Sequence, residues 1–316
     1  MHENDSGRVF FGLFLAYFWP KTQWKRPRTA IVLIVAMLAA TLSAARSADE
    51  VDDRGVAVRL AAPPQRIVSL LPSLTESVCA LGACERLVGV DRYSNAPERV
   101  RALPKVGGGL DASPEAVLAL RPDLVLAATS ARGIERLEAL GLKVLALEPR
   151  THEDVRRVLR VLGVALGTGG AQAGEDAWRR IDTAVGAIAR GLAPGARGLS
   201  VYVEVGPAPY GASESSFIGQ TLARLGARNV LPGSLGPFPK LSPEFVVRAD
   251  PDLIFIAEAE AARLPARPGW AGMRAVARGH VCALTPTQAD ALVRAGPRME
   301  EGARLIAQCL TRFSAR

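Results

Sequence analysis

One sequence pattern occurs twice in this chain, and it constrains the fold more than any other feature does. Residues 113–128 read SPEAVLALRPDLVLAA, and residues 242–257 read SPEFVVRADPDLIFIA. Each copy starts with a serine suited to cap a helix, a proline suited to the first helical position and a glutamate in the first turn. Each copy then passes through a Pro-Asp turn into an apolar run. The repeat therefore predicts two similar lobes, each with a short helix that leads into a buried strand.

Short apolar runs alternate with helical patterns in both halves of the chain. Continuous apolar strands separated by helices are typical of a parallel sheet that is covered on both faces. The predicted strands cover residues 66–70, 87–90, 124–127, 144–147, 200–205, 253–257 and 280–284. The predicted helices cover residues 74–81, 114–120, 134–140, 216–225, 243–248 and 297–313.

Two further helical stretches separate the halves. The first covers 151–162, where Thr151 and Asp154 have the spacing of a capping box, and the second covers 171–192. At 1.5 Å per residue the second helix is roughly 33 Å long, which is enough to connect two lobes. We therefore predict an α/β fold of two similar lobes with central parallel sheets, joined by one long rigid helix. The ligand cleft lies between the lobes, because ligands of open α/β sheets bind beyond the carboxyl ends of the strands. The expected boundaries are 63–165 for the N-terminal lobe, 170–192 for the linking helix and 197–316 for the C-terminal lobe.

The amino terminus has the features of a signal peptide. A basic stretch at 21–28 is followed by an apolar run at 30–42 and by small residues at 43–47. The apolar run is shorter than the about 20 residues that a transmembrane helix needs. We predict that 1–47 is a long leader that is cleaved on export to the periplasm, and an uncleaved membrane anchor is the alternative. There is no cysteine near the cleavage region, so lipid attachment is not expected.

The charge and the cysteines fit an exported protein. Half of the formal net charge of +8 belongs to the first 48 residues, and the remaining basic residues are mixed with acids, which does not suggest nucleic-acid binding. All four cysteines follow the leader. The simplest pairing is Cys79 with Cys84 and Cys282 with Cys309, although four cysteines allow three connectivities. Structural disulfides are expected, since neither pair has the spacing of a redox motif.

Several motifs resemble a known family. SLLPSLTE at 69–76, VGVDRYS at 88–94, LPKVGG at 103–108 and the two SPE repeats are similar to the signature of periplasmic binding proteins of the helical-backbone type. These proteins capture iron-siderophores, haem or cobalamin for ABC importers. The resemblance covers about residues 63–313. The RAGPRM segment at 294–299 makes the cobalamin-binding members the closest match.

The resemblance implies a set of ligand-binding residues. Tyr93 would pack on the face of a corrinoid, Asp290 would accept hydrogen bonds from amide groups at the corrin rim, and Arg294 would donate to amide carbonyls. Phe238 stands where the cobalamin binders have a stacking tryptophan, whereas the glycines at 107–109 replace a second tryptophan in the first lobe. The structural alternatives are a packing role for Tyr93 and an ordinary ion pair between Asp290 and Arg294.

Two more aromatic residues and two glutamates complete the predicted sites. Tyr210 and Trp270 are further candidates for ligand contact, although the position of Trp270 also suits packing at a helix start. The resemblance implies that Glu115 and Glu244, one on each lobe, dock onto a permease dimer that works with its ATPase. The alternative is that each glutamate merely complements the dipole of its helix. We expect the protein to be a monomer without a cofactor.

Enzymatic motifs are missing from the sequence. The segment 211–215 lacks the last glycine of a nucleophile elbow, and no dinucleotide-binding or Walker motif occurs. After the leader only His152 and His280 could serve as histidine ligands, so a bare metal ion is not the expected cargo. The missing motifs therefore predict a non-enzymatic binding protein, and the family resemblance implies a corrinoid as its ligand. The open alternatives are haem with Tyr93 as the axial ligand, a ferric siderophore held by arginines, and an enzyme or sensor that reuses the scaffold.

Overall fold

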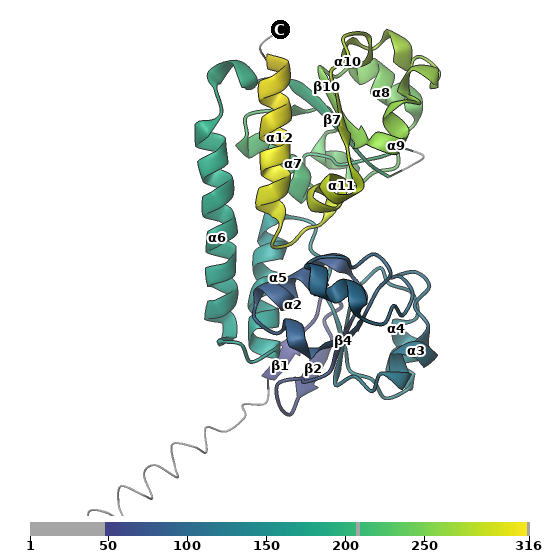
Figure 1. The fold of residues 1–316 in the computed structure, drawn as a ribbon, viewed down its shortest axis with the longest axis vertical. Coiled ribbons are helices and arrows are strands. Elements are labelled where there is room, and N and C mark those ends of the chain that lie inside the picture. Colours follow the sequence, from purple (N-terminus) through teal and green to yellow (C-terminus); the bar gives the residue numbers. More distant parts are fainter. Residues whose placement is uncertain (1–47, 207–208, 315–316) are drawn as a thin grey trace, which may run out of the picture. The chain divides into compact units, whose positions relative to one another are not determined.

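The computed structural model describes residues 48–206 and 209–314, and the predicted leader lies outside this range. The described residues form two α/β lobes with a group of long helices beside them (Figure 1). None of the described helices is long and apolar enough to cross a membrane.

The first lobe is built on a parallel sheet of four strands in the order β4-β3-β5-β6. The sheet is flanked by α2 (Pro72–Ala80), α3 (Pro114–Ala119) and α4 (Ile134–Ala139). Its strands are β3 (Ile67–Ser69), β4 (Leu87–Val90), β5 (Leu124–Ala127) and β6 (Val144–Ala146). All residues of β3, β5 and β6 are buried, as expected for a parallel sheet with two covered faces.

An antiparallel hairpin that the sequence pattern did not predict precedes this sheet. It consists of β1 (Ala48–Val51) and β2 (Ala57–Leu60). The turn residue Asp52 accepts a hydrogen bond from the backbone N–H of Ala146 at 3.2 Å, so the hairpin covers the edge strand β6.

The second lobe has a mixed sheet rather than a fully parallel one. Its main strands run in the order β11-β10-β7, all parallel, while β9 pairs with β7 in parallel and β8 pairs with it antiparallel. The strands are β7 (Ser200–Gly206), β8 (Tyr210–Gly211), β9 (Arg228–Asn229), β10 (Leu253–Ala257) and β11 (Val281–Leu284). The accompanying helices are α7 (Phe217–Arg224), α8 (Pro243–Ala249), α9 (Glu258–Ala261), α10 (Arg274–Ala277), α11 (Pro286–Val293) and α12 (Met299–Ser314).

The two copies of the repeat fold alike. In α3 the hydroxyl of Ser113 accepts a hydrogen bond from the backbone of Ala116, and in α8 Ser242 accepts one from Phe245. Proline occupies the start of both helices, and each helix leads into a buried strand, β5 or β10. The prediction from the repeat is confirmed.

Two consecutive helices lie along the chain between the sheets of the two lobes. The predicted linker is α6 (Gly170–Gly191), and it packs against α5 (His152–Ala165) and α12. The start of α5 already contacts the second lobe, because the backbone N–H of His152 donates to Gln220 of α7 at 2.7 Å. The backbones of α5 and α6 come close together at Gly174, where an added Cβ would lie 2.3 Å from the carbonyl oxygen of Leu159.

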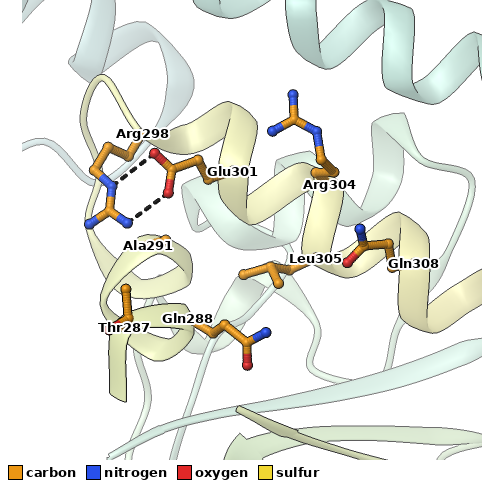
Figure 2. A pocket seen from close by; sticks show the side chains of 8 residues that line it. All are labelled: Thr287, Gln288, Ala291, Arg298, Glu301, Arg304, Leu305 and Gln308. Carbon is orange, nitrogen blue, oxygen red and sulfur yellow. Dashed lines mark hydrogen bonds and ion pairs between the residues drawn. The ribbon is translucent and has the colours of Figure 1, made fainter. Parts of the chain in front are cut away.

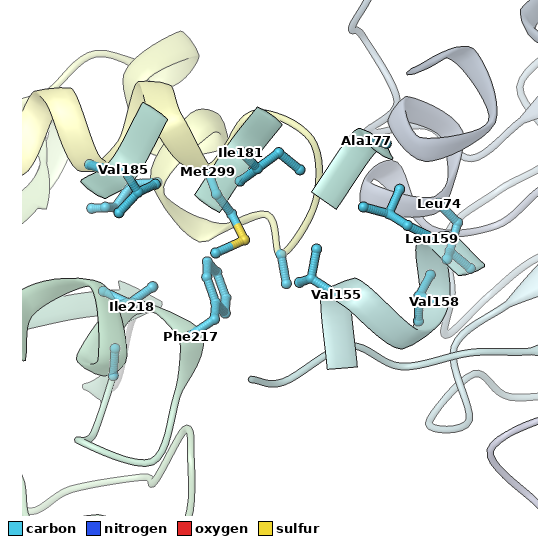
Figure 3. Packing of buried hydrophobic residues seen from close by; sticks show 14 of the residues in the cluster. Leu74, Val155, Val158, Leu159, Ala177, Ile181, Val185, Phe217, Ile218 and Met299 are labelled. Carbon is cyan, nitrogen blue, oxygen red and sulfur yellow. The ribbon is translucent and has the colours of Figure 1, made fainter. Parts of the chain in front are cut away.

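A continuous apolar core runs along these helices beneath both lobes (Figure 3). It joins Leu74 of the first lobe, Leu159 and Ile181 of the connecting helices, and Phe217 and Met299 of the second lobe. Because interiors of this kind are close-packed, the core holds the connecting helices firmly against both lobes.

Both predicted disulfides are present. Cys79 is bonded to Cys84 just after α2, and Cys282 of β11 is bonded to Cys309 of α12.

Candidate ligand-binding site

A cavity of about 400 Å³ lies between the two lobes. On the first lobe it is lined by the segments that directly follow each of the four parallel strands. On the second lobe it is lined by Phe217, Phe238 and the end of α11. The first-lobe residues are Leu71, Pro72, Ser73, Tyr93, Ala128, Ser130, Glu148, Pro149 and Arg150. The cavity therefore occupies the place that an open parallel sheet offers to a ligand.

A smaller cavity of about 220 Å³ lies between α11 and α12 (Figure 2). It is lined by the second lobe alone, and Arg298 and Glu301 at its edge form a bidentate ion pair. No aromatic side chain lines it, so it offers no surface for a flat ligand.

Tyr93 presents an exposed ring on the first-lobe side of the interlobe cavity. It follows β4, and 62% of its surface is exposed. Its backbone N–H donates to the carboxylate of Asp91 at 2.7 Å, and burial raises the pKa of that carboxyl. The ring rests against the backbone at Gly108, where an added Cβ would lie 3.2 Å from the ring edge. The glycine segment thus gives Tyr93 the space that a larger side chain would fill.

Phe238 lines the opposite side of the cavity. It packs edge to face against Phe217, with 6.1 Å between the ring centroids. The cavity therefore has aromatic surface on both lobes, as a flat ligand requires.

Arg294 lines the cavity, but its terminal nitrogens are already engaged. One nitrogen donates to Glu76 at 2.8 Å and to Asn95 at 2.9 Å, and the other donates to the carbonyl of Tyr93 at 2.9 Å. The second nitrogen also pairs with Asp290 at 2.8 Å. These four protein oxygens take up its terminal N–H groups in this arrangement, and donation by Arg294 to ligand carbonyls stays a prediction.

Asp290 keeps one oxygen available to the cavity. Its Oδ2 accepts from Asn95 and pairs with Arg294, each at 2.8 Å. None of the described residues donates to Oδ1. Asp290 therefore has an oxygen that can accept a hydrogen bond from a ligand, as the resemblance implied.

Glu148 is a second cavity carboxylate, and the sequence analysis missed it. Burial acts to raise its pKa, but hydrogen bonds from Thr129 and Ser130 outweigh burial and hold the pKa below its ordinary value. Arg150 lies 3.3 Å from the same carboxylate. The sequence did contain a signal for Glu148, which directly follows the apolar run at 144–147. The carboxyl ends of the strands in a parallel sheet meet at one edge, and ligands bind there.

Two predicted aromatic contacts lie elsewhere. Trp270 is fully buried in the core of the second lobe, packed against Tyr202 and beneath Arg267, so it has no surface to offer a ligand. This corrects the prediction and agrees with the packing alternative. Tyr210 lies on β8, bridges to Lys240 and does not line the cavity.

Glu115 and Glu244 occupy equivalent, exposed positions in the first turns of α3 and α8. Neither is engaged in an ion pair with any of the described residues. Both helices follow segments that reach the cavity, since Gly108 contacts Tyr93 before α3 begins and Phe238 precedes α8. Within residues 48–206 and 209–314, no three potential metal ligands are grouped closely enough to hold a metal ion.

Two α/β lobes, helices that connect them and a cavity at the ends of the parallel strands define a two-lobed ligand-binding protein. The chain belongs to the periplasmic binding protein family, which it matches over residues 67–287. The resemblance seen in the motifs is thereby confirmed.

The relatives of this chain include transport proteins. A Bacillus subtilis protein described as an uncharacterized ABC transporter substrate-binding lipoprotein is 29% identical over 262 residues, which cover 78% of this chain and 80% of that protein. The vitamin B12-binding protein of Pectobacterium carotovorum is 29% identical over 256 residues, which cover 79% of this chain and 90% of that protein. Among solved structures, a periplasmic heme binding protein from Pseudomonas aeruginosa superposes with a TM-score of 0.65 and is 29% identical, covering 79% of this chain and 93% of that one.

Proposed function

We propose that this protein captures a corrinoid in the interlobe cavity and delivers it to the permease of an ABC importer. The observation that carries the proposal is the composition of the cavity. Aromatic rings face it from both lobes, and a carboxylate with a free oxygen stands at its edge. A large flat ring with a fringe of amide groups fits such a site, because the rings bury its face and the carboxylate accepts from its N–H groups.

The charge balance favours a corrinoid over haem. Four charged side chains line the cavity, namely Glu148, Arg150, Asp290 and Arg294. Arg294 is engaged by protein oxygens, and Arg150 pairs with Glu148. The two carboxylates of a haem would thus face two cavity carboxylates and no cation that is free to pair with them. The amide N–H groups of a corrinoid would instead find hydrogen-bond acceptors in these carboxylates.

Haem remains the second candidate because of Tyr93. Its exposed phenol is chemically able to ligate ferric iron. The relatives include both a vitamin B12-binding and a heme binding protein at 29% identity, so they support the class of cargo more than its identity.

The location and the partners are part of the same proposal. Residues 1–47 act as a cleaved signal peptide, and the mature protein works as a monomer in the periplasm. It docks onto a permease dimer with its ATPase, and it performs no catalysis.

Absorption spectra of the purified protein after incubation with cyanocobalamin or haemin and removal of free ligand test the proposal. The expected result is a retained corrinoid spectrum in a 1:1 ratio. A retained haem spectrum with a tyrosinate charge-transfer band, together with complete loss of the corrinoid on desalting, would replace the corrinoid by haem.

A further inference from the structure

A hydrogen-bonded cluster joins the two lobes beside the cavity. We call it the interlobe latch, and it consists of Glu76, the Tyr93 carbonyl and Asn95 from the first lobe, with Asp290 and Arg294 from the second. Arg294, Asp290 and Asn95 form a closed ring, since each bonds to the other two at 2.8–2.9 Å.

Glu76 is the buried first-lobe carboxylate of the latch. It lies on α2, its side chain is 3% exposed, and it does not line the cavity. Its Oε1 accepts from Arg294 at 2.8 Å, and Arg298 lies 3.7 Å from the same oxygen. Among the described residues it is the one first-lobe carboxylate that pairs with Arg294.

The latch is reinforced by a close backbone approach. Gly296 follows Arg294, and an added Cβ there would lie 3.3 Å from the carbonyl oxygen of Ser73 on α2. The segment after α11 is therefore pressed against the helix that carries Glu76. This close approach keeps the Glu76 carboxylate beside the Arg294 guanidinium.

We propose that Glu76 is a positioning residue of the binding site. Through Arg294 it fixes the Tyr93 carbonyl and the Asp290 carboxylate in a single arrangement, and it thereby sets the separation of the two walls of the cavity. The inference rests on the proposed function for its ligand, but the geometry of the lobes does not depend on which ligand binds.

The physical reason is the cost of leaving a buried charge unpaired. Arg294 is 7% exposed, and its charge is balanced by Glu76 on one lobe and Asp290 on the other. When Glu76 is neutralised, the buried guanidinium keeps only Asp290 as a close ionic partner, and weakening a buried ionic group in this way is destabilising. Because Arg294 already lines the cavity, we expect it to turn toward the cavity in that case, which would release Tyr93 and shift Asp290.

The Glu76→Gln variant tests this role, because glutamine keeps the size of the side chain and removes its charge. Asn95→Ala is a second latch variant that leaves all three charges of the latch in place. Glu138→Gln is the matched control, since it breaks an ion pair with Arg54 within the first lobe at 2.8 Å and does not touch the latch. Spin labels at Glu135→Cys and Ala262→Cys, both exposed and one on each lobe, report the distance between the lobes.

Without ligand, the wild type and Glu138→Gln are expected to give one narrow distance distribution, while both latch variants give a broadened one. Affinity for cyanocobalamin, measured on folded protein well below the melting temperature, is expected to fall about tenfold in Glu76→Gln and to be unchanged in Glu138→Gln. A purely structural role would lower the melting temperature without this loss of affinity.

Latch variants whose unliganded distance distributions match those of the wild type and of Glu138→Gln would overturn the proposal. If cyanocobalamin fails to bind the wild type, the proposed function fails, while the distances between the labelled lobes still decide the role of Glu76.

Discussion

Tyr93 is held by its backbone from two directions, and its ring is left free. Its N–H donates to Asp91 within the first lobe, and its carbonyl accepts from Arg294 of the second. The side chain itself is 62% exposed and meets the cavity. A residue that is rigid in its backbone and exposed in its ring is suited to stack on a flat ligand at little cost in conformational entropy.

The pair of variants Tyr93→Phe and Tyr93→Ala separates stacking from metal ligation. Tyr93→Phe keeps the ring, so the affinity for cyanocobalamin is expected to stay within about twofold of the wild type. Tyr93→Ala removes the ring, and the affinity is expected to fall about tenfold, or about 1.4 kcal/mol. Titration calorimetry measures both. A loss in Tyr93→Phe as large as that in Tyr93→Ala would assign the interaction to the phenol hydroxyl rather than to stacking of the ring.

The sequence predicted which residues line the cavity more accurately than it predicted the contacts that they make there. Tyr93, Phe238, Asp290 and Arg294 all line it. The sequence showed only that Asp290 and Arg294 are four positions apart and could form an ion pair. It could not show Glu76, whose bond to Arg294 spans 218 positions, because such contacts depend on how the two lobes pack. The sequence therefore could not show that Arg294 bonds to oxygens of the first lobe.

At the scale of elements, the sequence predicted those helices and strands that depend mainly on neighbouring residues. The capping box of Thr151 and Asp154 is present, and β4, β5 and β10 have the predicted bounds. The short helix α11 and the hairpin β1–β2 were missed, because a helix of 8 residues has little periodicity and a hairpin at a sheet edge is stabilised by its packing. The contact between the start of α5 and the second lobe could not be predicted either, because it depends on tertiary packing.

His152 at the start of α5 makes stability depend on pH. Its Nε2 lies 3.1 Å from the carbonyl of Phe217 and 2.9 Å from the hydroxyl of Thr221 in α7. Burial, together with the nearby Arg224, lowers the pKa of His152 below its ordinary value of 6.5. The folded state therefore favours the neutral ring, and this stabilisation is complete above about pH 6.5 and is lost as the pH falls through the folded-state pKa.

Urea denaturation between about pH 7.5 and about pH 5 measures this effect. The free energy of unfolding of the wild type is expected to fall with decreasing pH more steeply than that of His152→Gln, which cannot be protonated. Parallel pH profiles for the two proteins would show that His152 is not responsible.

The bond between Cys282 and Cys309 ties β11 to α12 across 27 positions. In the chain-entropy model, removing it by alanine substitution at both cysteines lowers the free energy of unfolding by about 3.5 kcal/mol. Removal of the bond between Cys79 and Cys84, which are 5 positions apart, is expected to cost about 2 kcal/mol. Chemical denaturation compares the two double variants. Equal losses would show that loop length does not govern the effect.

At the scale of the whole molecule, the repeat places matching acids on both lobes. Glu115 and Glu244 are exposed and start equivalent helices. A permease dimer with two-fold symmetry requires one matching contact from each lobe. The helix dipole alone would also favour these acids, by about 0.3–1 kcal/mol, so their presence does not establish docking.

The double variant Glu115→Ala, Glu244→Ala is expected to bind ligand like the wild type and to lose uptake into vesicles that carry the permease and its ATPase. The matched control is Glu135→Ala with Glu258→Ala, which removes one exposed acid from each lobe at other positions. Normal uptake by the Glu115, Glu244 variant at limiting protein would rule out docking through this pair.

The two-lobed architecture could be predicted from the repeat and from the alternation of strands and helices, because both patterns reflect which residues are buried. Which ligand binds depends on a few side chains whose hydrogen bonds are determined by the packing between the lobes. Isothermal titration of the purified protein with cyanocobalamin, cobinamide and haemin tests the choice of ligand most directly. We expect a corrinoid to bind most tightly, with a dissociation constant below about 1 μM, or roughly −8 kcal/mol. Tight binding of haemin with no heat from either corrinoid would contradict this expectation.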